Sequence, residues 1–246
     1  MPHDPAALDT PLAALATFDW GGDASRLAPL DAAVVAAHGD AALRADLEKR
    51  FAALLAGAAP DAAKDYACRQ LARIGTAAAV PAVAPLLADG RRSHMARFAL
   101  EGIGGPEAGA ALRQALATVG DDLKLGMISS LGARPEPASV AALAPLLAGP
   151  PRLAAAAAAA LGLIRSPEAE RALAAARPAD AVTARSIDDA RLACAEALVA
   201  GNRAAAALPI YESLAAAAAG KPERRGVELA ATRGILACRD ARPAAS

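Results

Sequence analysis

The chain has 246 residues, of which 55% are hydrophobic and only 2% aromatic, and its 26 basic and 26 acidic residues leave no net charge. The charge is uneven, but even residues 64–185, with fourteen basic and ten acidic groups, carry a net charge of only +4. This is too little for duplex binding, so we expect no nucleic-acid partner. No run of 18 apolar residues is free of charges or turn signals, and residues 1–5 lack a basic n-region. We therefore expect no membrane partner and a cytoplasmic protein, exported only if a signal peptide precedes this numbering.

Alanine makes up about a third of the chain, and few segments alternate polar and apolar residues with period two. Alanine loses no side-chain entropy in a helix and lets helix backbones approach closely. Leucine, isoleucine and valine anchors with alanine between them suit thin, stacked helical layers. The composition therefore predicts an all-α protein.

Residues 1–60 are expected to form an N-terminal helical cap. Helices are predicted over about 5–18, 25–37 and 40–55, and none of them carries the repeat that follows. The first 63 residues hold nine acidic and four basic groups. Trp20, the only tryptophan, is expected to pack beneath this cap rather than to stack on a ligand.

Residues 61–180 repeat a pattern with a period of about 30. Leu86, Leu116 and Leu146 are 30 positions apart, which is the period of a two-helix unit. The pattern predicts four regular hairpins of antiparallel helices, stacked as a right-handed α-solenoid (superhelix). We expect Asp61, Ser93 and Ser166 to cap helices. Pro85 and Pro145 occupy matching positions in two of the second helices, and we expect each of these helices to start late or to bend.

Residues 181–246 are expected to form longer, divergent repeats that continue the same solenoid. Leu161 to Leu198 is 37 residues and Leu198 to Leu236 is 38. Helices are predicted over about 183–200, 203–218 and 222–238. The last helix has no partner in the pattern, so it folds back as a cap, dimerises or continues into a longer protein, and we favour the last alternative.

Three segments of the chain resemble a known family, two in the regular repeats and one in the longer repeats. Residues 67–71 with 74–83 look like the bacterial HEAT repeat of the phycobilisome-lyase-like type. Residues 93–101 and 210–212 resemble segments of large HEAT-repeat proteins of environmental bacteria such as planctomycetes. The resemblance implies HEAT-like repeats and a scaffold that binds a protein partner, or another domain of a longer chain, on its concave surface. The alternative is a bilin-lyase-like or chaperone-like subunit.

Catalytic and metal sites are not expected. HEAT-repeat hydroxylases with a di-iron site are similar in architecture, but they use several His-Glu pairs, and His3, His38 and His94 are followed by no glutamate. The three cysteines have no metal-ligand spacing and are expected to be buried. We therefore predict that the chain is not an enzyme and holds no cofactor and no metal.

One polar cluster stands out at the start of the predicted helix from Ser93. His94, Arg97 and Glu101 share a face at offsets of three and four, with two arginines before them. This cluster is either an Arg97–Glu101 surface pair or a patch for an acidic partner. Polar positions on the second helices add further candidates, and the predicted partner-binding residues are Arg91, Arg92, His94, Arg97, Arg113, Gln114, Arg171 and Arg177.

Overall fold

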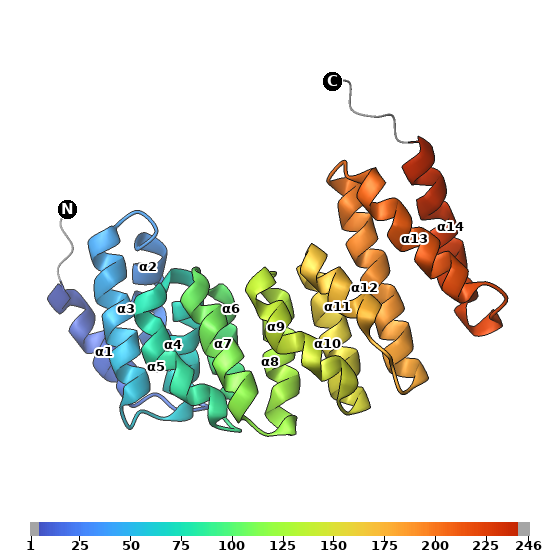
Figure 1. Cartoon of the computed structure of the whole chain (residues 1–246). Coiled ribbons are helices and arrows are strands. Elements are labelled where there is room, and N and C mark those ends of the chain that lie inside the picture. The colour runs from blue at the N-terminus through green and yellow to red at the C-terminus, as the bar shows by residue number, and fades with distance from the viewer. Residues whose placement is uncertain (1–4, 241–246) are drawn as a thin grey trace. The chain divides into compact units, whose positions relative to one another are not determined.

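The computed structural model describes residues 5–240, and it is built of helices that pack in neighbouring pairs (Figure 1). Within these residues there are fourteen α-helices and seven 3₁₀ segments and no strand. The chain divides into two compact units, Met1–Ser130 (unit 1) and Leu131–Ser246 (unit 2). The all-α fold of paired helices is therefore confirmed. The division into cap, regular repeats and longer repeats stays a prediction.

Unit 1 holds seven α-helices and most of an eighth. They are α1 (Asp9–Ala16), α2 (Ala28–Ala36), α3 (Ala41–Ala56), α4 (Asp61–Ile74), α5 (Val80–Val83), α6 (Ser93–Gly102), α7 (Pro106–Thr118) and the start of α8 (Asp121–Ala133), with the 3₁₀ segments η1 (Pro5–Leu8), η2 (Ala24–Leu27), η3 (Ala77–Ala79) and η4 (Ala84–Ala88).

Unit 2 continues with the end of α8 and six more α-helices. They are α9 (Val140–Leu143), α10 (Pro151–Ile164), α11 (Pro167–Ala175), α12 (Ala181–Ala200), α13 (Ala204–Ala218) and α14 (Arg225–Asp240), with η5 (Pro137–Ser139), η6 (Ala144–Ala148) and η7 (Pro222–Arg224).

Of the three helix caps predicted from the sequence, the structure confirms one and contradicts two. Ser166 accepts a hydrogen bond from the Ala169 amide at 3.1 Å, as predicted. The prediction that Asp61 and Ser93 are caps is wrong, because each is the first residue of its helix and accepts no capping bond. The Asp61 carboxylate accepts from Arg92 instead, so it is used between helices.

The two prolines at matching positions change the helix type. Pro85 lies in η4 and Pro145 in η6, and both segments read Ala-Pro-Leu-Leu-Ala. Proline lacks the amide hydrogen and clashes with the carbonyl one turn earlier, so an α-helix cannot pass through it undisturbed. Each of these second helices is therefore a four-residue α-helix flanked by 3₁₀ turns.

The first helices of successive hairpins approach so closely that only glycine fits at the contact. A Cβ atom on Gly102 would overlap the backbone carbonyl of Ala72, and one on Gly162 would lie 2.8 Å from Cα of Ala190. Gly102, Gly132 and Gly162 are 30 residues apart, so the repeat includes this contact position. Small residues thus set the spacing of the helical layers in both units.

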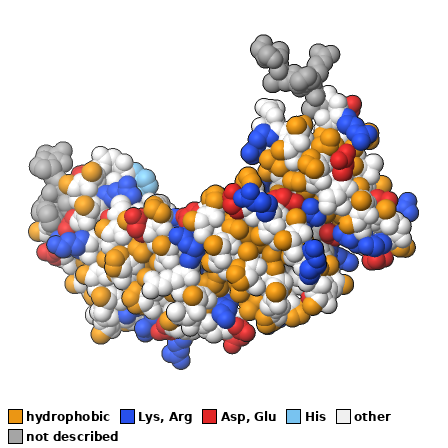
Figure 2. Space-filling view, in the orientation of Figure 1, with side chains coloured by type: hydrophobic (Ala, Val, Ile, Leu, Met, Phe, Trp, Pro, Cys, Tyr) orange, Lys and Arg blue, Asp and Glu red, His pale blue; other side chains and the backbone are white. Residues whose placement is uncertain are grey.

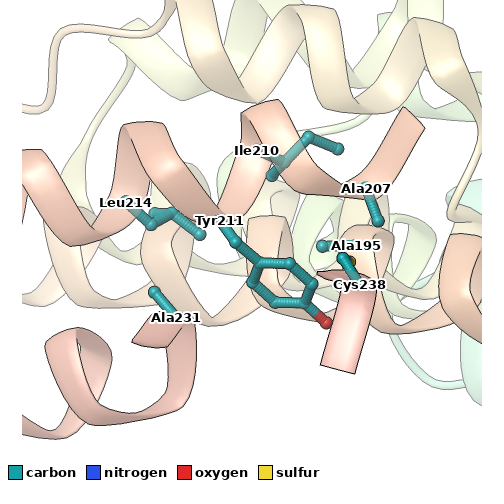
Figure 3. Packing of buried hydrophobic residues seen from close by; sticks show 7 residues of the cluster. All are labelled: Ala195, Ala207, Ile210, Tyr211, Leu214, Ala231 and Cys238. Carbon is teal, nitrogen blue, oxygen red and sulfur yellow. The ribbon is translucent and has the colours of Figure 1, made fainter. Parts of the chain in front are cut away.

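The last helix, α14, packs back against α13. The Tyr211 ring is directed toward α14 between Ala231 and Cys238 (Figure 3), and a Cβ atom on Gly234 would overlap this ring. Tyr211 is 4% exposed and Leu214 is fully buried. The contact with α13 does not cover the whole apolar face of α14, because Leu229 and Leu236 are 51% and 56% exposed, so the choice among the three alternatives stays a prediction.

Candidate binding pocket

The predicted patch at the start of α6 is only partly open to a partner. Arg92 Nε donates to Asp61 Oδ1 at 2.7 Å, and Arg97 donates to the Gly126 carbonyl and to Ser130 Oγ, both at 3.3 Å. These two arginines therefore join α6 to α4 and α8.

The other predicted residues of unit 1 are more accessible. Arg91 and His94 are exposed, and on α7 Gln114 is exposed while Arg113 is half-buried. Glu101 accepts from Ser130 Oγ at 2.6 Å, so the predicted Arg97–Glu101 pair is linked through this buried serine.

In unit 2, Arg171 lies on the wall of a pocket of about 330 Å³ where α11, α12 and α13 meet. Arg177 lies after α11 and donates to the Ala175 and Ala176 carbonyls, away from the pocket lining. We call this cavity the arginine pocket. The residues that line it are Arg165, Ser166, Pro167, Glu170, Arg171, Cys194, Leu198, Arg203, Ala206 and Ile210.

Three exposed guanidinium groups belong to the arginine pocket. Arg171 pairs with Glu168 at 2.8 Å, but both side chains are largely exposed, so this pair contributes little to stability. Arg165 donates only to the Gly162 carbonyl, at 3.3 Å, and no carboxylate among the described residues pairs with Arg165 or Arg203. The pocket therefore has positive charge that the fold does not neutralise.

The backbone at Arg165 is unusual. Its φ of 53° and ψ of 29° place it in the left-handed helical region, directly after α10. A side chain costs about 1–2 kcal/mol in this conformation, so helices commonly end there with glycine. The chain instead has an arginine at this position, and its side chain lines the pocket.

The floor of the arginine pocket combines apolar side chains with a buried ion pair. Glu170 Oε1 accepts from Arg191 Nε at 2.9 Å, while Glu170 Oε2 is buried and has no partner. Burial raises the pKa of Glu170, against the opposing effect of Arg191. Burial, with the nearby Glu170, also raises the pKa of the Cys194 thiol to about 11, so this thiol is protonated at neutral pH and is a poor nucleophile.

The sequence predicted Arg171 but missed Arg165 and Arg203. Both lie at turns between helices, where an arginine in the sequence is usually interpreted as part of a surface loop and not as part of a site. One signal was available, because Arg165 follows Ile164 at the position where the first repeat has Gly75 after Ile74.

The three cysteines, Cys68, Cys194 and Cys238, are free and buried, as predicted. Within residues 5–240, no group of three or more His, Cys, Asp or Glu side chains is placed to hold a metal ion; His3 lies outside these residues. None of the helices that the structure describes is both long and apolar enough to cross a bilayer.

Comparison with known proteins gives distant structural likeness but no family. A scan of protein-family models and a search of curated proteins give no match. Among solved structures, human deoxyhypusine hydroxylase in complex with glycerol is similar, with 17% identity and a TM-score of 0.37 over 76% of this chain and 95% of that chain.

This comparison corrects one prediction. We expected that the chain is not an enzyme, but the similar chain is an enzyme. An array of paired helices can carry a catalytic site as readily as a binding surface, because function depends on the site and not on the fold. The prediction of a non-catalytic protein is therefore withdrawn.

Proposed function

We propose that this protein binds a protein partner, and that the arginine pocket of unit 2 receives an acidic segment of that partner with an aliphatic side chain. One observation carries the proposal. The guanidinium groups of Arg165 and Arg203, which no carboxylate neutralises, lie in the same pocket as an apolar floor that includes Leu198 and Ile210. Arginine forms bidentate bonds with carboxylates, and an adjacent apolar surface adds burial.

The size of the pocket favours a side chain over a large cofactor. Its volume of about 330 Å³ lies at the small end of ligand pockets, so it accommodates one or two side chains and not a tetrapyrrole. Arg171 lies on α11, the second helix of its hairpin, where partner-facing residues were predicted. On the face drawn in Figure 2, hydrophobic side chains also cover much of the surface, with charged side chains scattered among them.

The direct test uses a synthetic peptide, acetyl-Glu-Leu-Asp-Leu-Glu-amide, and its uncharged counterpart with Gln and Asn. Calorimetry at low salt should detect binding of the acidic peptide alone, and added salt should weaken it. Arg203→Gln should weaken binding by about tenfold, the loss of one charge-assisted contact of about 1.4 kcal/mol. Arg152→Gln, an exposed arginine of α10 outside the pocket, is the matched control.

Arg165→Gly separates binding from folding. Glycine relieves the left-handed backbone, so this variant should unfold at the same or a higher temperature than the natural chain while it binds the acidic peptide more weakly. Equal binding of the acidic and uncharged peptides, or unchanged binding by both arginine variants, would contradict the proposal.

A further inference from the structure

A second pocket lies in unit 1, where the segment before α2 meets α4. Its volume is about 300 Å³, and its walls include the aromatic side chains of Phe18, Trp20 and Tyr66. Aromatic residues are only 2% of the chain, so three in one pocket is a concentration that composition alone does not explain. We call this cavity the aromatic pocket.

Trp20 is not part of the core. The sequence predicted that it packs beneath the N-terminal cap, but its side chain is 66% exposed, so this prediction is wrong. Its backbone amide donates to Asp19 Oδ1 at 2.8 Å, which holds the turn that carries it. Because an exposed tryptophan adds little to folding, its place at the edge of a pocket indicates a contact surface.

The charge on the wall of the aromatic pocket comes from Asp31. One carboxylate oxygen, Oδ1, accepts from the Tyr66 hydroxyl at 2.8 Å and from Gln70 Nε2 at 3.2 Å, and both donors are neutral. No arginine or lysine among the described residues pairs with Asp31. The other lining carboxylate, Asp65, is paired with Arg69 at 2.7 Å, so these two charges cancel.

Two more arginines, Arg26 and Arg73, belong to the segments that form this pocket, and neither of them lines it. Arg73 donates to Gln70 Oε1 at 3.3 Å. The Arg69 guanidinium does line the pocket, and it is paired with Asp65. The wall therefore presents aromatic rings beside one unneutralised carboxylate. The faces of aromatic rings attract cations, and an adjacent carboxylate adds a direct charge contact.

We propose that the aromatic pocket binds an organic ammonium group, as presented by a lysine side chain of a partner protein. Residues 1–60, which supply one side of this pocket, carry eight acidic and four basic groups, while α4 on the other side carries two acidic and three basic groups. The site lies within unit 1 and does not depend on the arginine pocket, so failure of either proposal leaves the other standing.

The test uses the fluorescence of Trp20, which is the only tryptophan and so reports on this pocket alone. The probes are tetramethylammonium chloride and N-acetyl-lysine amide, each titrated against sodium chloride at equal ionic strength. The neutral comparisons are tert-butanol and N-acetyl-lysine amide that is also acetylated on its side-chain nitrogen. We expect a saturable change with the two cations and none with the neutral compounds.

Variants then test the assigned carboxylate. Asp31→Asn keeps an acceptor for Tyr66 but removes the charge, so it should weaken binding of tetramethylammonium by about fivefold or more, the size of one cation contact. Asp122→Asn, an exposed acid at the start of α8, should leave it unchanged. Trp20→Leu, followed by calorimetry, should abolish binding while circular dichroism stays that of the natural chain.

Two outcomes would overturn this inference. One is an equal fluorescence response to tert-butanol and to tetramethylammonium, which would show an apolar surface without charge preference. The other is full affinity for tetramethylammonium in the folded Asp31→Asn variant. If tetramethylammonium binds and N-acetyl-lysine amide does not, the pocket takes quaternary ammonium compounds and the assignment of a lysine side chain is wrong.

Discussion

Helices meet in two different ways in this protein. In the hairpin layers, Gly102 lies against the backbone of Ala72 and Gly162 against that of Ala190, whereas at the end of unit 2 Gly234 lies beneath the ring of Tyr211. A backbone cannot move aside without shifting its whole helix, but a side chain can be removed or can rotate. The two kinds of contact should therefore respond differently to the same glycine-to-alanine change.

The largest effect is expected where glycine faces backbone. Gly102→Ala and Gly162→Ala should each lower the free energy of unfolding by about 3 kcal/mol, because the added methyl group must push two helices apart. Urea denaturation measures this loss. Gly226→Ala, in α14 with open space around it, should stay within about 0.5 kcal/mol of the natural chain.

The contact beneath the ring should be repairable. Gly234→Ala should cost about 2 kcal/mol, since its methyl group overlaps the Tyr211 ring. In a Tyr211→Leu background the same change should cost much less, so the two substitutions should be strongly non-additive. A double-mutant cycle measured by thermal unfolding checks this, and additive losses would mean that the ring is not the obstacle.

A flexible side chain should give the smallest packing effect. The Arg97 guanidinium crosses Gly126, and a Cβ atom there would lie 2.6 Å from Arg97 Nε. Gly126→Ala should displace the guanidinium and lose its bond to Ser130, at a cost of about 1 kcal/mol. If Gly126→Ala instead matches Gly102→Ala in urea denaturation, Arg97 is held as firmly as a backbone.

A polar contact between helices adds a pH dependence that the glycine contacts lack. The groups that face Glu170 are Arg165, Arg191, Cys194 and Arg203, with Arg171 on its own helix. Burial raises the pKa of Glu170, so the folded state holds this proton more firmly than the unfolded state. Ionisation of Glu170 therefore lowers the free energy of unfolding as the pH rises through the raised pKa of the folded state. This loss is absent at pH values below the ordinary pKa of a glutamate.

Glu170→Gln should remove that dependence. The variant should be more stable than the natural chain near pH 8, and the difference should shrink as the pH falls toward 4. It should also bind the acidic peptide more tightly at pH 8, because one negative charge leaves the arginine pocket. Urea denaturation across this range checks the first effect, and a constant difference at every pH would contradict it.

The sequence predicted most of the helices but not their interruptions or contacts. The 30-residue spacing of leucines placed the hairpins, and Ser166 was identified as a cap from Ser-Pro-Glu. Asp61 and Ser93 also looked like caps, but neither accepts a capping bond, and Asp61 is paired with Arg92 from the next hairpin. A local pattern cannot show a competing partner that is 31 residues away.

The candidate sites were predicted less well than the fold. Arg171 was identified and lies in the arginine pocket, but Arg165 and Arg203 were missed because they belong to turns whose positions depend on how α10 to α13 pack. Trp20 was expected to be buried because large aromatic residues usually are, and the structure leaves it exposed beside Tyr66.

By itself, the sequence determined the helical class, the period of the hairpins and the burial of the cysteines, because these follow from local spacing and side-chain polarity. Only the tertiary structure decided which glycines lie at helix-helix contacts, which arginines bond to other helices and which have no carboxylate partner. Those properties depend on residues from different hairpins coming within a few ångströms of one another, and no local pattern encodes that distance.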